Sequence, residues 1–171
     1  MRGTMDKPTP WELRRIRGVA NYQFGGQTGR ILFPRGVRVT RSPRTGRVRL
    51  ITYRGKVLAT LRSNDGLLSL TIDGAKRLVD RMGPEAPLTV KVKEGFEEFI
   101  KKGRSLFAKH VLEADPAIRP RSEVLIVDKY GRLLAVGKAV LSGVEMTSFR
   151  IGLAVKVRRG LCEMERTSSQ P

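Results

Sequence analysis

Residues 103–143 read GRSLFAKHVLEADPAIRPRSEVLIVDKYGRLLAVGKAVLSG, and residues 149–158 read FRIGLAVKVR. The first stretch begins with the glycine that follows a predicted short helix, Glu94–Lys102, which has carboxylates in its first turns and lysines at its end. This polarity matches the helix macrodipole, and glycine suits the position just after a helix. A crossover bounded by Pro116 and Pro120 follows. The stretch therefore predicts a helix that leads through a crossover into a group of strands.

The strands of this half are indicated by apolar runs and by alternation. Glu123–Val127 and Leu133–Leu141 flank a short turn-forming segment, which predicts a β-hairpin. Residues 88–93 alternate apolar and polar side chains, which predicts another strand. Ala154–Arg158 alternates in the same way, so its lysine and arginine are expected on one outward-facing side of the last strand.

The N-terminal half predicts short strands separated by turns and followed by a helix. The helix Asp73–Met82 has the clearest signal, because its apolar residues recur at helical spacing and a Gly-Pro pair stops it. Trp11–Arg17 predicts a single helical turn. The strands are expected at Ile31–Phe33, Val37–Val39, Val48–Tyr53, Lys56–Leu61 and Leu67–Leu70.

The predicted domain boundary lies at Pro84–Pro87, because two prolines in four residues suit neither a helix nor the interior of a sheet. We expect a flexible arm at 1–10 and a small α/β accessory domain with an antiparallel sheet at 11–87. A second domain at 88–162 and a flexible tail at 163–171 complete the predicted organisation. The predicted fold class is α+β.

Charge indicates the class of partner. The chain carries 34 Lys and Arg against 16 Asp and Glu, a formal net charge of +18, with a sequence pI near 11.2. Both halves are cationic, and arginine, which suits bidentate phosphate contacts, dominates the first. The alternative is a solvated surface with many ion pairs, but 16 acids cannot neutralise 34 bases. The composition therefore favours a nucleic acid as partner.

Catalytic chemistry is poorly represented in the sequence. One cysteine, Cys162, excludes an intrachain disulfide or a multi-cysteine metal site, and the single histidine, His110, lies in an apolar run. A phosphate-binding loop with its lysine is absent, since the cluster Gly25–Gly29 contains none. We therefore expect no catalytic residue, cofactor or metal. No apolar run approaches the length of a membrane span or of a signal peptide's core, which predicts a cytoplasmic protein without a membrane partner.

The motifs quoted above resemble a known family. Residues 88–160 resemble the PUA domain, an RNA-binding pseudo-barrel found beside tRNA- and rRNA-modifying enzymes, and above all the copy in archaeal archaeosine tRNA-guanine transglycosylases. Residues 16–82 resemble the small α/β domain that precedes the PUA domain in those enzymes, and the segments that carry this likeness are Tyr22–Gly25, Ser42–Arg47, Leu58–Arg62 and Asp65–Gly66. The resemblance implies a PUA-type β pseudo-barrel in the second half.

The same resemblance implies RNA binding without catalysis. The transglycosylase's catalytic barrel, with its aspartates and cysteine-rich zinc site, has no counterpart in this sequence, and neither has the catalytic signature of the related archaeosine synthase. The family grips the acceptor stem and the single-stranded 3′ end of tRNA. In the family, the glycine-bearing segment after the first helix and the adjacent strands approach the RNA, which favours Gly103 and its neighbours as contacts.

Cations that cluster in the predicted elements are the candidate RNA-binding residues, because phosphates and 2′-hydroxyls dominate recognition of A-form RNA. Phe107, Tyr130 and Phe149 are candidates for base stacking, but for Phe107 and Phe149 the interpretation as core residues is favoured. The candidate RNA-binding residues are Lys101, Lys102, Gly103, Arg104, Lys109, Arg119, Arg121, Lys138, Arg150, Lys156, Arg158, Arg44 and Arg47.

Three functional hypotheses follow. The first is a non-catalytic tRNA-binding protein that presents tRNA to a separate transglycosylase-type modification enzyme. The second is a ribosome-biogenesis or translation factor that binds rRNA. The third is an enzyme with an unrecognised site, assembled across a dimer.

Overall fold

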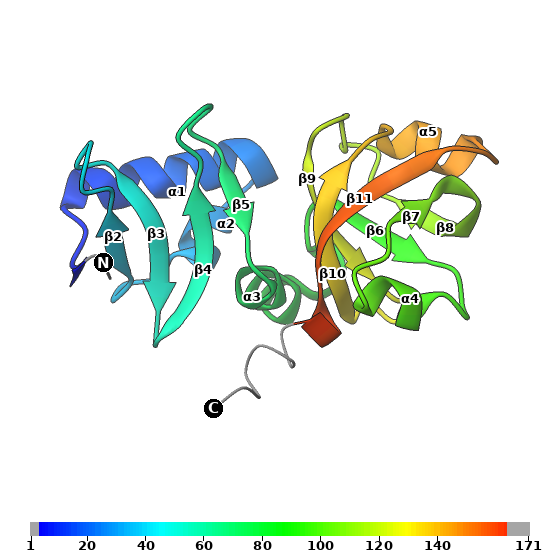
Figure 1. The fold of residues 1–171 in the computed structure, drawn as a ribbon, viewed down its shortest axis with the longest axis horizontal. Coiled ribbons are helices and arrows are strands. Elements are labelled where there is room, and N and C mark those ends of the chain that lie inside the picture. The colour runs from blue at the N-terminus through cyan, green and yellow to red at the C-terminus, as the bar shows by residue number, and fades with distance from the viewer. Residues whose placement is uncertain (1–3, 164–171) are drawn as a thin grey trace. The chain divides into compact units, whose positions relative to one another are not determined.

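The computed structural model describes residues 4–163, and its internal contacts divide the chain into two units, 1–81 and 82–171 (Figure 1). Each unit combines an antiparallel or mixed sheet with short helices, which confirms the predicted α+β class. Among the described residues, no helix is both long enough and apolar enough to span a membrane.

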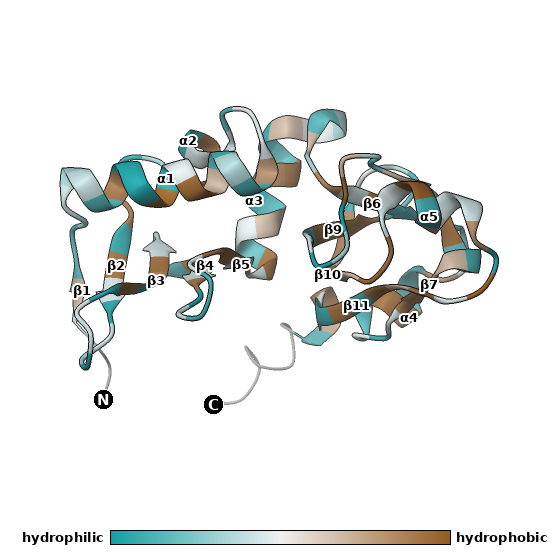
Figure 2. Ribbon diagram, turned by 90° about the horizontal axis from the view of Figure 1, so that it is seen from above, coloured by the Kyte–Doolittle hydropathy of each residue, from teal (hydrophilic) through white to brown (hydrophobic). Residues whose placement is uncertain are grey.

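The first unit is an antiparallel sheet with helices on one face. Its strand order is β1-β2-β3-β4-β5, and each neighbouring pair is antiparallel. Figure 2 shows α1 lying along one face of this sheet. The elements are β1 (Met5–Asp6), α1 (Pro10–Phe24), α2 (Thr28–Leu32), β2 (Arg38–Arg41), β3 (Val48–Tyr53), β4 (Lys56–Leu61), β5 (Leu68–Leu70) and α3 (Ile72–Met82).

Helix α1 is longer than the single turn predicted at Trp11–Arg17. Thr9 and Glu12 form a capping box at its start, and Pro10 occupies the first helical position. The helix buries one residue per turn, Ile16, Ala20 and Phe24. Four of the six positions between them are Arg17, Gly18, Asn21 and Gln23, so the apolar periodicity is too weak to show the full length of the helix.

Two further predictions for the first unit are wrong. Ile31–Phe33, predicted as a strand, overlaps helix α2, because a three-residue apolar run does not distinguish a buried helix from a strand. This helix packs closely on α1: a Cβ on Gly29 would lie 2.3 Å from the carbonyl oxygen of Arg17. The predicted flexible arm at 1–10 contains strand β1, which pairs with β2.

The second unit is a mixed, nearly closed sheet of order β7-β11-β10-β9-β6-β8. Strands β6 and β9 are parallel, and the other neighbouring pairs are antiparallel. The buried faces of β9 and β10 supply much of its core. The elements are η1 (Gly83–Glu85), β6 (Thr89–Val92), α4 (Glu97–Lys101), β7 (Leu106–Phe107), η2 (Ala108–His110), β8 (Val111–Ala114), β9 (Glu123–Val127), β10 (Leu133–Ala139), α5 (Gly143–Ser148) and β11 (Leu153–Gly160).

Helix α5 was not predicted, although the sequence contains a local signal for it. Ser142 and Glu145 form a capping box, with each side chain accepting from the other residue's backbone N–H. Gly143 lets this helix approach the chain after β8, since a Cβ there would lie 2.0 Å from the carbonyl oxygen of Asp115. The predicted tail at 163–171 lies outside the described residues except for Glu163.

Candidate nucleic-acid interface

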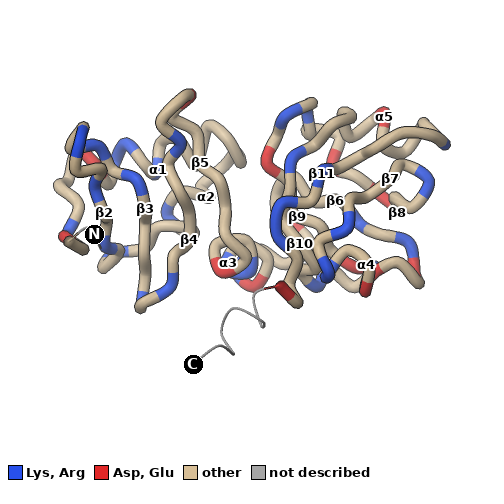
Figure 3. The backbone as a smooth tube through the Cα atoms, in the orientation of Figure 1, with Lys and Arg blue, Asp and Glu red and all other residues tan. Residues whose placement is uncertain are grey.

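Lysines and arginines occur on several strands and loops of the second unit (Figure 3). A row of charged residues crosses β9, β10 and β11: Lys138 on β10 is paired in register with Lys156 on β11 and with Glu123 on β9. Arg158 donates from Nη1 to Oε2 of Glu123 at 3.0 Å, and its Nη2 donates to the other carboxylate oxygen. The row therefore contains three cations and one carboxylate, which leaves it with a positive charge.

The two predicted RNA contacts on β11 differ in whether a carboxylate of the protein already binds their charged group. Lys156 is exposed, as expected from the alternation of the strand. The guanidinium of Arg158 is instead bound to Glu123, whose side chain is almost completely buried. Both residues are exposed, as the alternation predicts, but the guanidinium of Arg158 is engaged by Glu123. A buried carboxylate requires a partner, and that requirement determines the conformation of Arg158.

A second group of predicted contacts lies at the end of α4. Lys101 donates to Glu98 at 2.8 Å, and this hydrogen bond raises the pKa of the lysine. Lys102 and Arg104 are exposed and lie on either side of Gly103. Gly103 has a φ of +82°, and its N–H donates to the carbonyl of Ile100, so it ends the helix as predicted.

Four more predicted contacts of the second unit lie outside its strands. Arg119 on the crossover donates to the carbonyl of Pro116 at 2.9 Å, and Arg121 is exposed near the start of β9. Lys109 and Arg150 are brought into neighbouring segments, because the N–H of Ala108 donates to the carbonyl of Gly152 at 2.9 Å. The structure thus gathers these cations in several small groups.

Three aromatic residues near these cations are exposed. Tyr130 is 71% exposed, with the cations of Lys129 and Arg132 within 5.3 Å of its ring centroid. Phe107 and Phe149 are about half exposed, so their interpretation as core residues is wrong. The signal that could have shown this is their sequence context, since a cation follows each of them within two residues.

His110 is a packed histidine. Its ring stacks on Phe96 with centroids 3.6 Å apart. Burial lowers the pKa of His110, and the nearby charges of Lys109 and Lys93 lower it further. The imidazole is therefore neutral at physiological pH and adds no charge to the surface around it.

In the first unit, Arg44 and Arg47 line a hollow of about 940 Å³ beside the ends of β2, β3, β4 and β5. Arg41, which belongs to the same basic segment of the sequence, is not part of this lining. Its guanidinium binds Glu12 at 2.8 Å and Asp6 at 3.0 Å. Sequence reasoning could not distinguish Arg41 from Arg44 and Arg47, which have no ion pair among residues 4–163, because the partners of Arg41 lie 29 and 35 positions away.

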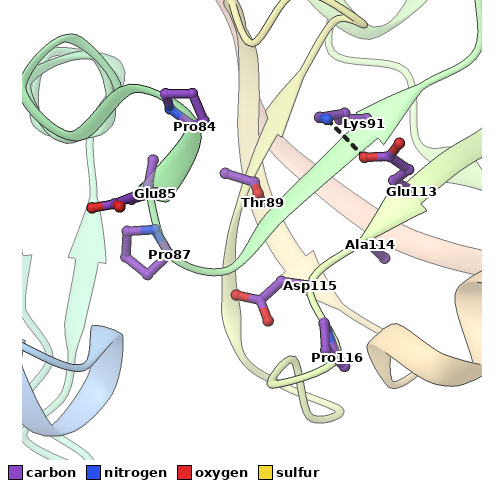
Figure 4. Close-up of a pocket in the computed structure, with 10 residues that line it drawn as sticks. Pro84, Glu85, Pro87, Thr89, Lys91, Glu113, Ala114, Asp115 and Pro116 are labelled. Atoms are coloured by element: carbon purple, nitrogen blue, oxygen red, sulfur yellow. Dashed lines mark hydrogen bonds and ion pairs between the residues drawn. The ribbon is translucent and has the colours of Figure 1, made fainter.

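A smaller hollow of about 440 Å³ lies in the second unit, between prolines and the chain after β8 (Figure 4). Two of its three acidic residues have partners: Glu113 binds Lys91 at 2.7 Å, and Asp115 accepts from the N–H groups of Leu88 and Ala117. Among residues 4–163, no group of three or more potential metal ligands is gathered. Structural contacts therefore account for Glu113 and Asp115.

Comparison with known proteins assigns both units. Residues 14–85 match the family described as patch-forming domain C2 of tRNA-guanine transglycosylase, and residues 89–161 match the PUA domain. The tRNA-guanine(15) transglycosylase of Thermococcus onnurineus is 46% identical over 159 residues, which cover 92% of this chain and 27% of that enzyme. The enzyme of Pyrococcus furiosus is 47% identical over 148 residues, covering 86% of this chain and 25% of that enzyme.

Solved structures show the same fold. A hypothetical protein of Pyrococcus horikoshii matches with a TM-score of 0.77 and 24% identity, covering 98% of this chain and all of that one. A conserved PUA domain protein from Thermoplasma acidophilum matches with a TM-score of 0.64 and 20% identity, covering 92% and 93%. These matches support the fold assignment.

The chain is therefore a PUA-domain protein. More particularly, it joins a C2 domain and a PUA domain in the way that archaeal tRNA-guanine transglycosylases do. It spans about a quarter of the length of these curated relatives, and the matching part consists of their C-terminal domains.

Proposed function

We propose that this chain is a non-catalytic tRNA-binding protein that holds the acceptor stem and 3′ end of tRNA for a separate, transglycosylase-type modification enzyme. The observation that carries the proposal is the joined C2 and PUA domains, which the chain shares at above 40% identity with tRNA-modifying enzymes. The match is confined to the non-catalytic C2 and PUA domains of those enzymes, which supports a role in binding.

The electrostatics of the PUA unit support this role. Exposed Lys102 and Arg104 flank the end of α4, and Lys156 faces Lys138 across β11 and β10. No ion pair holds these four cations within the described part of the chain. A folded RNA presents phosphates that can contact such separate groups of cations. Because side chains cannot read its deep, narrow major groove, phosphates and 2′-hydroxyls are the main contacts.

The proposal is tested by measuring the affinity of the full chain for a tRNA transcript, for the same tRNA lacking its single-stranded 3′ end, and for an rRNA fragment of equal length. We expect the intact tRNA to bind most tightly. The logarithm of the affinity should fall steeply with the logarithm of salt concentration, because each neutralised phosphate contributes roughly −0.9 for duplex or −0.7 for single strands to the slope. Equal binding of all three RNAs, or tighter binding of the rRNA fragment, would contradict it.

The role of a separate enzyme is tested by isolating the tagged chain from cells and identifying both its RNA and its protein partners. We expect tRNA together with a transglycosylase-type catalytic protein. Dominant rRNA would instead support the ribosome-assembly hypothesis. Guanine exchange by the purified chain alone, lost on substitution of an aspartate, would contradict a non-catalytic role.

A further inference from the structure

Two hairpin loops of the first unit repeat the same geometry. In the β2–β3 loop, the N–H of Ser42 donates to the carbonyl of Arg47, and Gly46 donates back to Ser42. In the β4–β5 loop, the N–H of Arg62 donates to Leu67 in the same way, and the N–H of a glycine donates back to Arg62. Figure 1 shows both loops at one end of the sheet, opposite the β3–β4 turn. They form the walls of the 940 Å³ hollow, which we call the arginine groove.

The lining of the arginine groove suits a phosphodiester backbone. Its only acid among the described residues is Asp65, which binds Arg62 at 2.9 Å. Apart from its arginines, the rest of its polar side chains are hydroxyls and an amide, which suit sugar and phosphate oxygens. No ion pair within residues 4–163 holds the exposed arginines of the β2–β3 loop and β3. The arginines that line the groove are Arg15, Arg44, Arg47, Arg49 and Arg62.

The groove continues onto the solvent-facing side of α1 through Arg15. The guanidinium of Arg15 lies 5.5 Å from the ring centroid of Trp11, which is 59% exposed. Tyr22, seven positions after Arg15 and so on the same helical face, is 84% exposed. An aromatic residue beside an arginine in a basic groove is the arrangement on which unpaired bases stack in proteins that bind single-stranded nucleic acid.

Gly18 lies between these residues on the same face. A Cβ at this position would meet nothing within 4 Å, so no contact inside the protein requires glycine. A glycine in the interior of a helix costs about 1 kcal/mol relative to alanine. The bare backbone leaves room for a ligand to approach the helix closely at this point.

We propose that the arginine groove and the Trp11–Tyr22 face of α1 form a second RNA site, distinct from the PUA unit, that binds an unpaired strand with phosphates in the groove and a base stacked on Trp11. This inference rests on the proposed function, since it requires that the chain bind RNA. RNA is favoured over a protein partner because the groove is lined with arginines and hydroxyl groups, whereas protein interfaces have a core depleted of charge.

The single tryptophan of the chain gives this site its own signal. Titration of the full chain with tRNA should quench the emission of Trp11 and shield it from acrylamide, in step with the binding measured by anisotropy of labelled tRNA. If tRNA binds while Trp11 emission and acrylamide quenching stay unchanged, this inference is overturned and the proposed function stands. If tRNA does not bind at all, both fail.

Matched variants separate the site from general charge. The double substitution Arg44→Gln with Arg47→Gln should lower tRNA affinity at least tenfold and reduce the salt slope by about 1.4 to 1.8, since two phosphate contacts are lost. The control, Arg35→Gln with Arg38→Gln, removes the same charge near the start of β2, at the other end of the sheet, and should change both quantities much less. Equal effects of the two pairs would overturn the proposal, as would a Trp11 signal that responds to a protein partner and not to tRNA.

Discussion

The guanidinium of Arg158 on β11 binds the carboxylate of Glu123 on β9, although 35 residues separate them in the chain and β10 lies between their strands. Glu123 is only 2% exposed. Replacement of Arg158 by glutamine therefore leaves a buried carboxylate without its cation, and we expect the free energy of unfolding to fall by about 3–5 kcal/mol. Urea denaturation measures this change, with Arg159→Gln as the control on the same strand. A loss no larger than that of the control would contradict the structural role.

Lys156 has the opposite expected effect on stability. It faces Lys138 across the β10–β11 pair, and like charges in this position are destabilising. The substitution Lys156→Glu replaces repulsion by attraction, so stability should rise by about 0.2–1 kcal/mol while RNA affinity falls. Thermal unfolding and tRNA binding are measured on the same sample. Unchanged RNA affinity would show that this face lies outside the RNA contact surface.

Glu12 makes the first unit sensitive to acid. The hydrogen bond from Arg41 is the main reason that the pKa of Glu12 lies at about 2, and the capping contact with Thr9 lowers it further. A pKa lowered on folding stabilises the protein above the unfolded value of 4.5, and this contribution is lost as the pH falls from 4.5 towards 2. We expect Glu12→Gln to cost about 1–2 kcal/mol at pH 7 and to flatten the pH dependence of stability in this range. Chemical denaturation at pH 3, 5 and 7 would show this, and an unchanged pH profile would contradict it.

His110 gives the second unit a separate pH dependence. Its pKa lies below 6.5, first because of burial and then because of Lys109 and Lys93. As the pH drops below 6.5, the imidazole of His110 is therefore protonated more readily in the unfolded chain than in the folded one. The free energy of unfolding falls in this range. NMR titration of the imidazole should give this lowered pKa, and Lys109→Gln should raise it part of the way towards 6.5. A pKa at or above 6.5 in the native chain would contradict the packing of His110 against Phe96.

The sequence was most informative where a signal is local. The charge polarity of residues 94–102 located α4, although the helix begins three residues later than predicted. Alternation located β6 and β11, and an apolar run beside a turn located β9. The strand predicted at Ile31–Phe33 was wrong because a short apolar run is compatible with either a strand or a helix. The capping box at Ser142 was present and was overlooked.

The candidate site was harder to predict than the fold. Cationic side chains could be counted in the sequence, but their ion-pair partners lie on distant segments: Arg41 and Arg158 are paired over about 30 residues, whereas Arg44 is not held by any ion pair in the described chain. Exposure of Phe107 and Phe149 likewise depends on where short elements pack. Pairing and exposure are tertiary properties, and both decide which cations and aromatic rings are available to a ligand.

The two matching hairpin loops also allow the width of the arginine groove to vary. Each loop closes through its own backbone hydrogen bonds and lies at the end of the sheet, away from the buried side chains of β3 and β4. A residue inserted into either tip would change the spacing of the walls without disturbing the core, since surface loops tolerate insertions better than packed elements do. The width of the opening can thus be tuned, by evolution or by design, independently of the stability of the domain that carries it.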